Sequence, residues 1–203
     1  MKLYLSSYNL GNYSDKLLDM LFDKKIAVIA NASDLKTKEE RIEKVNEEFN
    51  NLNVIGLEVE EIDLREYFNK TDGLKAKLNE FKAVWVKGGN TFVLRRAMAQ
   101  SGFDRLILEK KNQNDFVYAG YSAGSCVVTK NLHGLDIVDD PISVPYGYNK
   151  ETIWEGLGFV DYSIAPHYKS DHPESFKVDK TVEFFVENNM PYKTLRDGEV
   201  III

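Results

Sequence analysis

Cysteine is nearly absent from this chain. Cys126 is the single cysteine among 203 residues, so no disulfide can form within the chain. It lies in an apolar stretch, which predicts a buried thiol rather than a reactive one. No apolar run approaches the roughly 20 residues that a membrane-spanning helix needs, and the amino terminus lacks the apolar core of a signal peptide. We therefore expect a cytoplasmic protein that does not bind membranes.

Positive charge is also scarce. The chain has 26 Lys and Arg against 32 Asp and Glu, which gives a formal net charge of −6. This excess of negative charge argues against a general binder of nucleic acid or anionic membranes. The apolar fraction of 43% is typical of a globular protein with a substantial core. Together with the length, it favours one α/β domain that spans residues 1–203.

Short apolar runs alternate with amphipathic segments along most of the chain. The predicted strands cover 2–6, 25–30, 57–64, 83–86, 116–119 and 162–165, and the predicted helices cover 15–22, 38–50, 71–81, 92–100, 103–112 and 174–188. This alternation predicts a doubly wound, mostly parallel sheet with helices on both faces. At the end of the chain, residues 192–195 and 199–203 are predicted to form a hairpin around Arg196-Asp197-Gly198.

The residues from 116 to 128 carry the most informative motif. Ser122 lies between Gly120 and Gly124, in the spacing Gly-x-Ser-x-Gly that is typical of a nucleophile elbow. Such a turn exposes the serine hydroxyl at the C-terminal edge of a sheet. It also leaves the Ala123 N–H unpaired, where it could stabilise a developing oxyanion. Small-residue turns also join strands to helices without any catalytic role, so the motif alone leaves a purely structural interpretation open.

A second glycine-rich loop follows the predicted strand 83–86. Ligands bind at the C-terminal strand ends of open α/β sheets, and this loop lies at such an end. The Gly89 N–H could supply a second oxyanion donor. The alternative is an ordinary strand-to-helix turn in which Asn90 or Thr91 caps the helix.

A nucleophilic serine needs a base, and the chain has three histidines. His167 follows a predicted strand and is favoured by that position. His172 lies further into the same loop. His133 comes shortly after the elbow helix and is predicted to cap the far end of that helix, away from the hydroxyl of Ser122.

The base in turn needs an acid to orient it. Asp197 in the predicted hairpin turn is one candidate, although an Asp-Gly pair often serves the turn itself. The loop after the elbow helix offers three more, namely Asp136, Asp139 and Asp140. The residues alone do not decide among these four carboxylates.

Three motifs together resemble a known family. Gly-Tyr-Ser-Ala-Gly-Ser, the upstream Gly-Gly-Asn-Thr and the downstream Pro-His-Tyr occur in the order found in the serine peptidases of the dipeptidase E family, with cyanophycinase as a more distant relative. The resemblance covers nearly the whole chain. It implies a fold like that of the class I glutamine amidotransferases, with serine in place of the cysteine nucleophile. It also implies hydrolysis of small peptides without a metal or organic cofactor.

The resemblance assigns roles to four residues of this chain. Ser122 matches the nucleophile, His167 matches the general base, and the backbone N–H groups of Gly89 and Ala123 match the oxyanion donors. The best-known member of the family cleaves dipeptides with N-terminal aspartate, and this preference requires a cation near the substrate, for which Arg196 is one candidate.

The third member of the triad is less clear from the resemblance. Dipeptidase E has an aspartate in the loop after the elbow helix, and that position falls on Gly134 here. Cyanophycinase has a glutamate in the terminal hairpin, where this chain has Asp197. Asp197 is therefore the preferred orienting acid and Asp136 the second choice.

An esterase or amidase acting on a non-peptide acyl group would need the same residues. A non-catalytic binding protein could keep the elbow as a scaffold. The sequence leaves both alternatives open, as it does the choice between a monomer and a small homo-oligomer.

Overall fold

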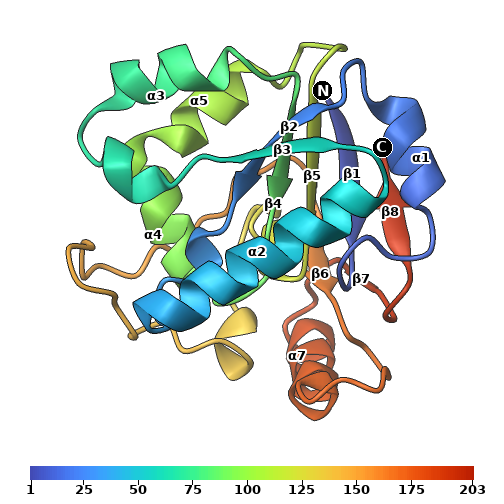
Figure 1. Cartoon of the computed structure of the whole chain (residues 1–203). Coiled ribbons are helices and arrows are strands. Elements are labelled where there is room, and N and C mark those ends of the chain that lie inside the picture. Colours follow the sequence, from blue (N-terminus) through green and yellow to red (C-terminus); the bar gives the residue numbers. More distant parts are fainter.

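A six-stranded sheet forms the centre of the computed structural model, which describes residues 1–203 (Figure 1). The strand order is β3-β2-β4-β5-β1-β8, and all strands are parallel except β8, which pairs antiparallel with β1. The bounds are β1 (Lys2–Ser6), β2 (Lys25–Ile29), β3 (Glu58–Glu61), β4 (Ala83–Val86), β5 (Val117–Tyr121) and β8 (Val200–Ile202). The prediction of a mostly parallel sheet is confirmed.

Helices cover both faces of the sheet, as predicted. They are α1 (Ser14–Met20), α2 (Lys38–Val54), α3 (Thr71–Leu78), α4 (Thr91–Ser101), α5 (Phe103–Glu109), α6 (Ala123–Cys126) and α7 (Ser175–Glu187). Residues of α1 and α2 pack on one face, and residues of α3, α4 and α5 pack on the other. None of these helices combines the length and the apolar character that crossing a lipid bilayer requires.

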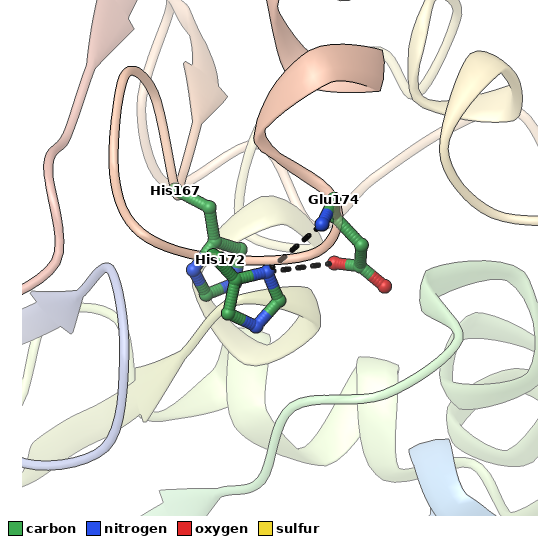
Figure 2. Close-up of side chains that lie close together, drawn as sticks. All are labelled: His167, His172 and Glu174. Carbon is green, nitrogen blue, oxygen red and sulfur yellow. Dashed lines mark hydrogen bonds and ion pairs between the residues drawn. The ribbon is translucent and has the colours of Figure 1, made fainter.

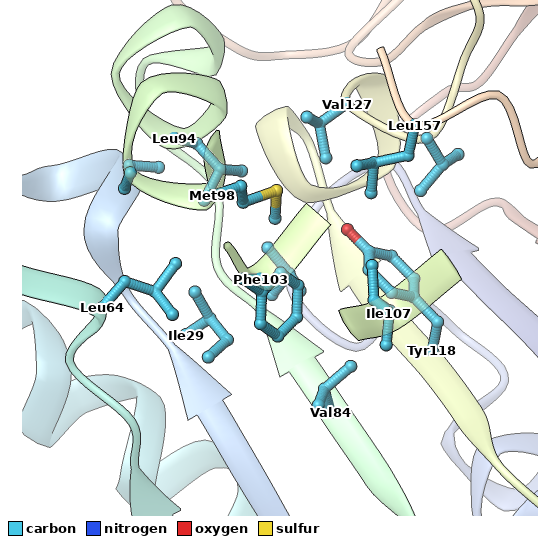
Figure 3. Close-up of a cluster of buried hydrophobic side chains, with 14 of the residues drawn as sticks. Ile29, Leu64, Val84, Leu94, Met98, Phe103, Ile107, Tyr118, Val127 and Leu157 are labelled. Carbon is cyan, nitrogen blue, oxygen red and sulfur yellow. The ribbon is translucent and has the colours of Figure 1, made fainter. Parts of the chain in front are cut away.

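The central strands are buried on both sides because alternate side chains point to opposite faces. In β4, Val84 and Val86 belong to the larger apolar cluster, whereas Ala83 and Trp85 belong to the smaller one. Figure 3 shows part of the larger cluster, in which Phe103 and its helical neighbours lie over the strands. These apolar runs fix the sheet and leave its C-terminal edge free for polar loops.

The predicted C-terminal hairpin is wrong. β7 (Tyr192–Thr194) pairs in parallel with β6 (Ser163–Ala165) in a separate two-stranded sheet, and β8 pairs with β1 instead of β7. The segment between β7 and β8 therefore crosses from the small sheet to the large one. A local turn signal could not reveal this, because both strands find partners distant in the sequence. The crossing carries Asp197 towards the end of β1.

Candidate active site

Ser122 lies on a sharp turn between β5 and α6. Its backbone has φ 49° and ψ −116°, a conformation that few side chains adopt without support from their surroundings. Its N–H contacts the carbonyl oxygens of Ser6 and Ser7 at 3.2 Å each, which anchors the turn to the end of β1. A Cβ at Gly124 would lie 2.1 Å from the Val86 carbonyl oxygen, so only glycine lets the turn approach β4 this closely.

Two unpaired backbone N–H groups flank this serine. The N–H groups of Gly89 and Ala123 donate no hydrogen bond within the chain. Gly89 has φ +144°, and a Cβ there would lie 2.5 Å from the Ala32 carbonyl oxygen. Gly88 is so close to the elbow that a Cβ on it would lie 3.0 Å from the Cβ of Ser122. The two loops predicted from the sequence thus meet at one point.

The same glycine-rich loop also starts a helix. Asn90 caps α4, and its side-chain oxygen accepts a hydrogen bond from the Val93 N–H at 2.9 Å. The capping role and the exposed Gly89 N–H are therefore compatible, since the cap uses the residue after Gly89.

His167 and Asp197 are hydrogen-bonded to each other. The His167 Nδ1 lies 2.7 Å from Asp197 Oδ1, and the histidine is only 2% exposed. An ionised carboxylate can only accept, so Nδ1 carries the proton and Nε2 keeps its lone pair. Burial is the main cause that lowers the pKa of His167; the neighbouring His172 adds to this, and Asp197 opposes it.

Ser7, which sequence reasoning missed, joins this pair to the main sheet. Its fully buried hydroxyl accepts a hydrogen bond from the His167 N–H at 2.8 Å and can donate to Asp197 Oδ1 at 2.9 Å. Ser7 directly follows β1, so it lies at the C-terminal edge of the parallel sheet. Its position after a predicted strand could have identified Ser7 as a site residue from the sequence, because ligand-binding residues lie at this edge of parallel sheets.

Ser122, Gly89 and His167 line one cavity of about 470 Å³. No hydrogen bond joins Ser122 to His167. In enzymes without substrate, catalytic hydrogen bonds are often long and tighten only when substrate binds. The cavity also has charged walls: Lys36, Lys44, Lys87, Glu47, Glu48, Asp139 and Glu174 contribute to it. Arg196 does not line it, so the sequence candidate for a substrate-binding cation lies elsewhere.

The other predicted acids form no hydrogen bond with His167. The Asp136 carboxylate accepts a hydrogen bond from the Gly134 N–H, and the Asp140 carboxylate accepts one from the Ile142 N–H. Asp139 lines the cavity and accepts a hydrogen bond from the Thr91 N–H at 2.8 Å. Desolvation by burial raises the pKa of Asp139 to about 6, although the Thr91 hydrogen bond opposes the shift.

The two remaining histidines differ in their surroundings. His133 stacks on Trp154 with ring centres 4.2 Å apart, so the prediction that it caps the elbow helix is wrong; that helix ends at Cys126. His172 stacks on His167 with ring centres 3.7 Å apart and planes 10° from parallel. It therefore supports one face of the candidate base.

His167, His172 and Glu174 also offer metal-ligand atoms within 4.8 Å of one another (Figure 2). An imidazole binds a metal through a lone pair in the plane of its ring, and one ion cannot lie in the planes of two stacked rings. Asp197 already occupies Nδ1 of His167, and Nδ1 of His172 accepts the Glu174 N–H at 3.2 Å. The arrangement does not suit the tetrahedral geometry that zinc requires.

The fold and this site define a class of α/β protein in which a serine elbow and the histidine of a histidine–carboxylate pair line one cavity. The sequence model of Peptidase family S51 matches residues 5–203, and the chain belongs to that family. The probable alpha-aspartyl dipeptidase of Drosophila melanogaster is 32% identical over 126 residues, and the peptidase E of Streptomyces coelicolor is 34% identical over 142 residues. These matches cover 60% and 68% of this chain.

The chain spans about half the length of the curated relatives it matches, with 49% and 54% of those two proteins aligned. Solved structures show the same fold over the whole chain. A provisionally named peptidase E from Listeria monocytogenes EGD-e superposes with a TM-score of 0.74 at 24% identity, covering 100% of this chain and 97% of that one. A peptidase from an acI-B1 actinobacterium gives 0.63 at 15% identity, covering 100% and 82%.

Proposed function

We propose that this chain is a serine peptidase that hydrolyses short peptides, with Ser122, His167 and Asp197 as its catalytic triad. The observation that carries the proposal is the pair formed by His167 and Asp197 in the cavity that also holds Ser122. Family membership supports the peptidase class. A small-peptide substrate and a cytoplasmic location remain predictions.

In the proposed mechanism, the Ser122 hydroxyl attacks the carbonyl carbon of the scissile bond. His167 Nε2 takes the hydroxyl proton and later gives it to the leaving amine. Asp197 holds Nδ1 in the protonated form and stabilises the imidazolium. The free N–H groups of Gly89 and Ala123 hold the oxyanion of the tetrahedral intermediate. Water then attacks the acyl-enzyme by the same route and releases the product.

A preference for N-terminal aspartate is a finer proposal. One relative is named as an alpha-aspartyl dipeptidase. In this chain the cations that could attract such a side chain are the three lysines of the cavity wall, Lys36, Lys44 and Lys87. Four carboxylates on the same wall could attract the free amino group of a peptide. A mixed wall of this kind suits a small zwitterion better than a long chain.

The test is a panel of dipeptides and tripeptides, with and without N-terminal Asp, assayed with wild type and Ser122→Ala. We expect Ser122→Ala to lose nearly all turnover while its thermal unfolding stays close to wild type. A fluorophosphonate should label wild type and not the variant, because it reacts with an activated serine. Labelling without cleavage of any peptide would favour an esterase or amidase, and absence of both would favour a binding protein.

A further inference from the structure

Lys87 is a buried cation beside the candidate oxyanion site. It follows β4 directly and precedes Gly88 and Gly89, and it is only 8% exposed. Its ammonium donates a hydrogen bond to the Gly88 carbonyl oxygen at 3.2 Å. We propose that Lys87 is a positioning residue that holds and polarises the Gly88–Gly89 peptide, the unit whose N–H would bind the oxyanion. This inference rests on the proposed function.

The geometry follows from the planarity of the peptide bond. The Gly88 carbonyl and the Gly89 N–H belong to one amide group, and no peptide bond of the chain is cis. In a trans amide the two groups point in opposite directions. Lys87 therefore binds one end of the amide and leaves the N–H at the other end, where it has no partner within the chain.

Such a contact acts in two ways. Two consecutive glycines give a turn with wide conformational freedom, so an oxyanion donor in it needs an external restraint. A cation on the carbonyl oxygen supplies that restraint. It also polarises the amide and strengthens the hydrogen bond that the N–H donates, since linked hydrogen bonds in a low dielectric reinforce one another by roughly 10–30%. The gain appears mainly in the transition state, when the oxyanion carries its charge.

The surroundings of Lys87 favour this role over an ordinary ion pair. Its ammonium forms no salt bridge, whereas Lys44 on the same cavity wall pairs with Glu47. Among the acidic groups around it, Glu48 has the largest effect on the pKa of Lys87. The Glu48 carboxylate accepts hydrogen bonds from Trp85 and Tyr121, and burial raises its own pKa. Burial lowers the pKa of Lys87 and Glu48 opposes the shift, so Glu48 helps keep the ammonium charged.

A competing role for Lys87 is direct binding of a carboxylate on the substrate. The two roles predict different kinetics. A residue that acts on the oxyanion peptide changes kcat for every substrate. A residue that binds a substrate carboxylate changes KM, and only for acidic peptides.

The experiment compares Lys87→Met with Lys82→Met, which makes the same substitution at the half-exposed lysine that directly precedes β4 and lies outside the cavity. For acidic and neutral peptides alike, we expect Lys87→Met to lower kcat about tenfold while KM stays within about threefold. Its affinity for a peptidyl boronate, which forms a tetrahedral adduct, should fall by the same factor as kcat. Lys82→Met should leave both kcat and the boronate affinity within about threefold of wild type.

Three outcomes would overturn the inference. These are an unchanged kcat in folded Lys87→Met, a loss confined to the KM of acidic peptides, and an equal loss in Lys82→Met. Lys87→Gln provides a second neutral variant if Lys87→Met does not fold. Ser122→Ala, assayed in parallel, tests the proposed function separately from the role of Lys87. If Ser122→Ala keeps turnover, the proposed function fails. If only the Lys87 variants contradict expectation, the proposed function stands and the inference about Lys87 fails.

Discussion

Replacing Asp197 by Asn tests the acidic member of the proposed triad. The substitution removes the negative charge that faces the His167 ring and keeps the size of the side chain. The ring and the carboxylate touch through a 2.7 Å N···O contact, so their charge centres lie somewhat farther apart. Two unit charges about 4 Å apart attract by about 4 kcal/mol at an effective dielectric constant of 20.

This attraction is present when the imidazolium forms in the transition state and is missing when the ring is neutral. Its loss should therefore appear in kcat. About 4 kcal/mol corresponds to roughly a 10³-fold decrease, because each 1.36 kcal/mol or so is a factor of ten. The asparagine amide can also donate to Nδ1, which would leave the proton on Nε2 and block the base.

The assay is kcat and kcat/KM on the best dipeptide of the panel, with thermal unfolding as a check of folding. Asp136→Asn is the matched control, since it makes the same substitution in the second-choice acid, whose carboxylate accepts a hydrogen bond from the Gly134 N–H and forms none with His167. It should keep kcat within about threefold of wild type. The reasoning is refuted if folded Asp197→Asn stays within tenfold of wild type, or if Asp136→Asn shows the larger loss.

Two further predictions concern pH. Burial lowers the pKa of His167, and a general base must be neutral to accept a proton. We therefore expect kcat/KM to persist as pH falls through 6.5, the usual histidine value, and to decline with an apparent pKa below it. A midpoint above 6.5 would contradict the assignment of His167 as the base. The pKa of Asp139 is raised to about 6, so the folded state binds more protons between about pH 4 and 6 and loses stability as pH rises through that window. The free energy of unfolding of Asp139→Asn, measured in urea and compared with that of wild type, should therefore rise by up to about 3 kcal/mol between pH 4 and pH 7. If the difference between variant and wild type is the same at both pH values, the raised pKa is contradicted.

Much of the candidate site could be predicted from local sequence. The elbow around Ser122 depends on residues within a few positions of it, because the glycines must let the turn pass close to β4. The glycine-rich loop is likewise local, and its Asn90 cap needs only the first turn of α4. The parallel sheet follows from continuous apolar runs that must be covered on both faces.

Charged residues on apolar faces were harder to interpret. Glu48 of α2 is only 3% exposed, and its carboxylate accepts hydrogen bonds from Trp85 and Tyr121. Lys87 is a similar case at the end of β4. A charged residue is buried only where the fold supplies its partners, and those partners lie on other elements.

The sequence by itself determined the serine elbow, the glycine-rich loop after β4 and the layered α/β architecture, since each depends on short-range geometry and periodicity. Only the tertiary structure decided how the site closes. Ser7 bonds with His167 across a separation of 160 residues and with Asp197 across 190. The strands around Asp197 pair with β6 and β1 rather than with each other. Such contacts depend on which distant segments satisfy each other's hydrogen bonds, and no local pattern records that choice.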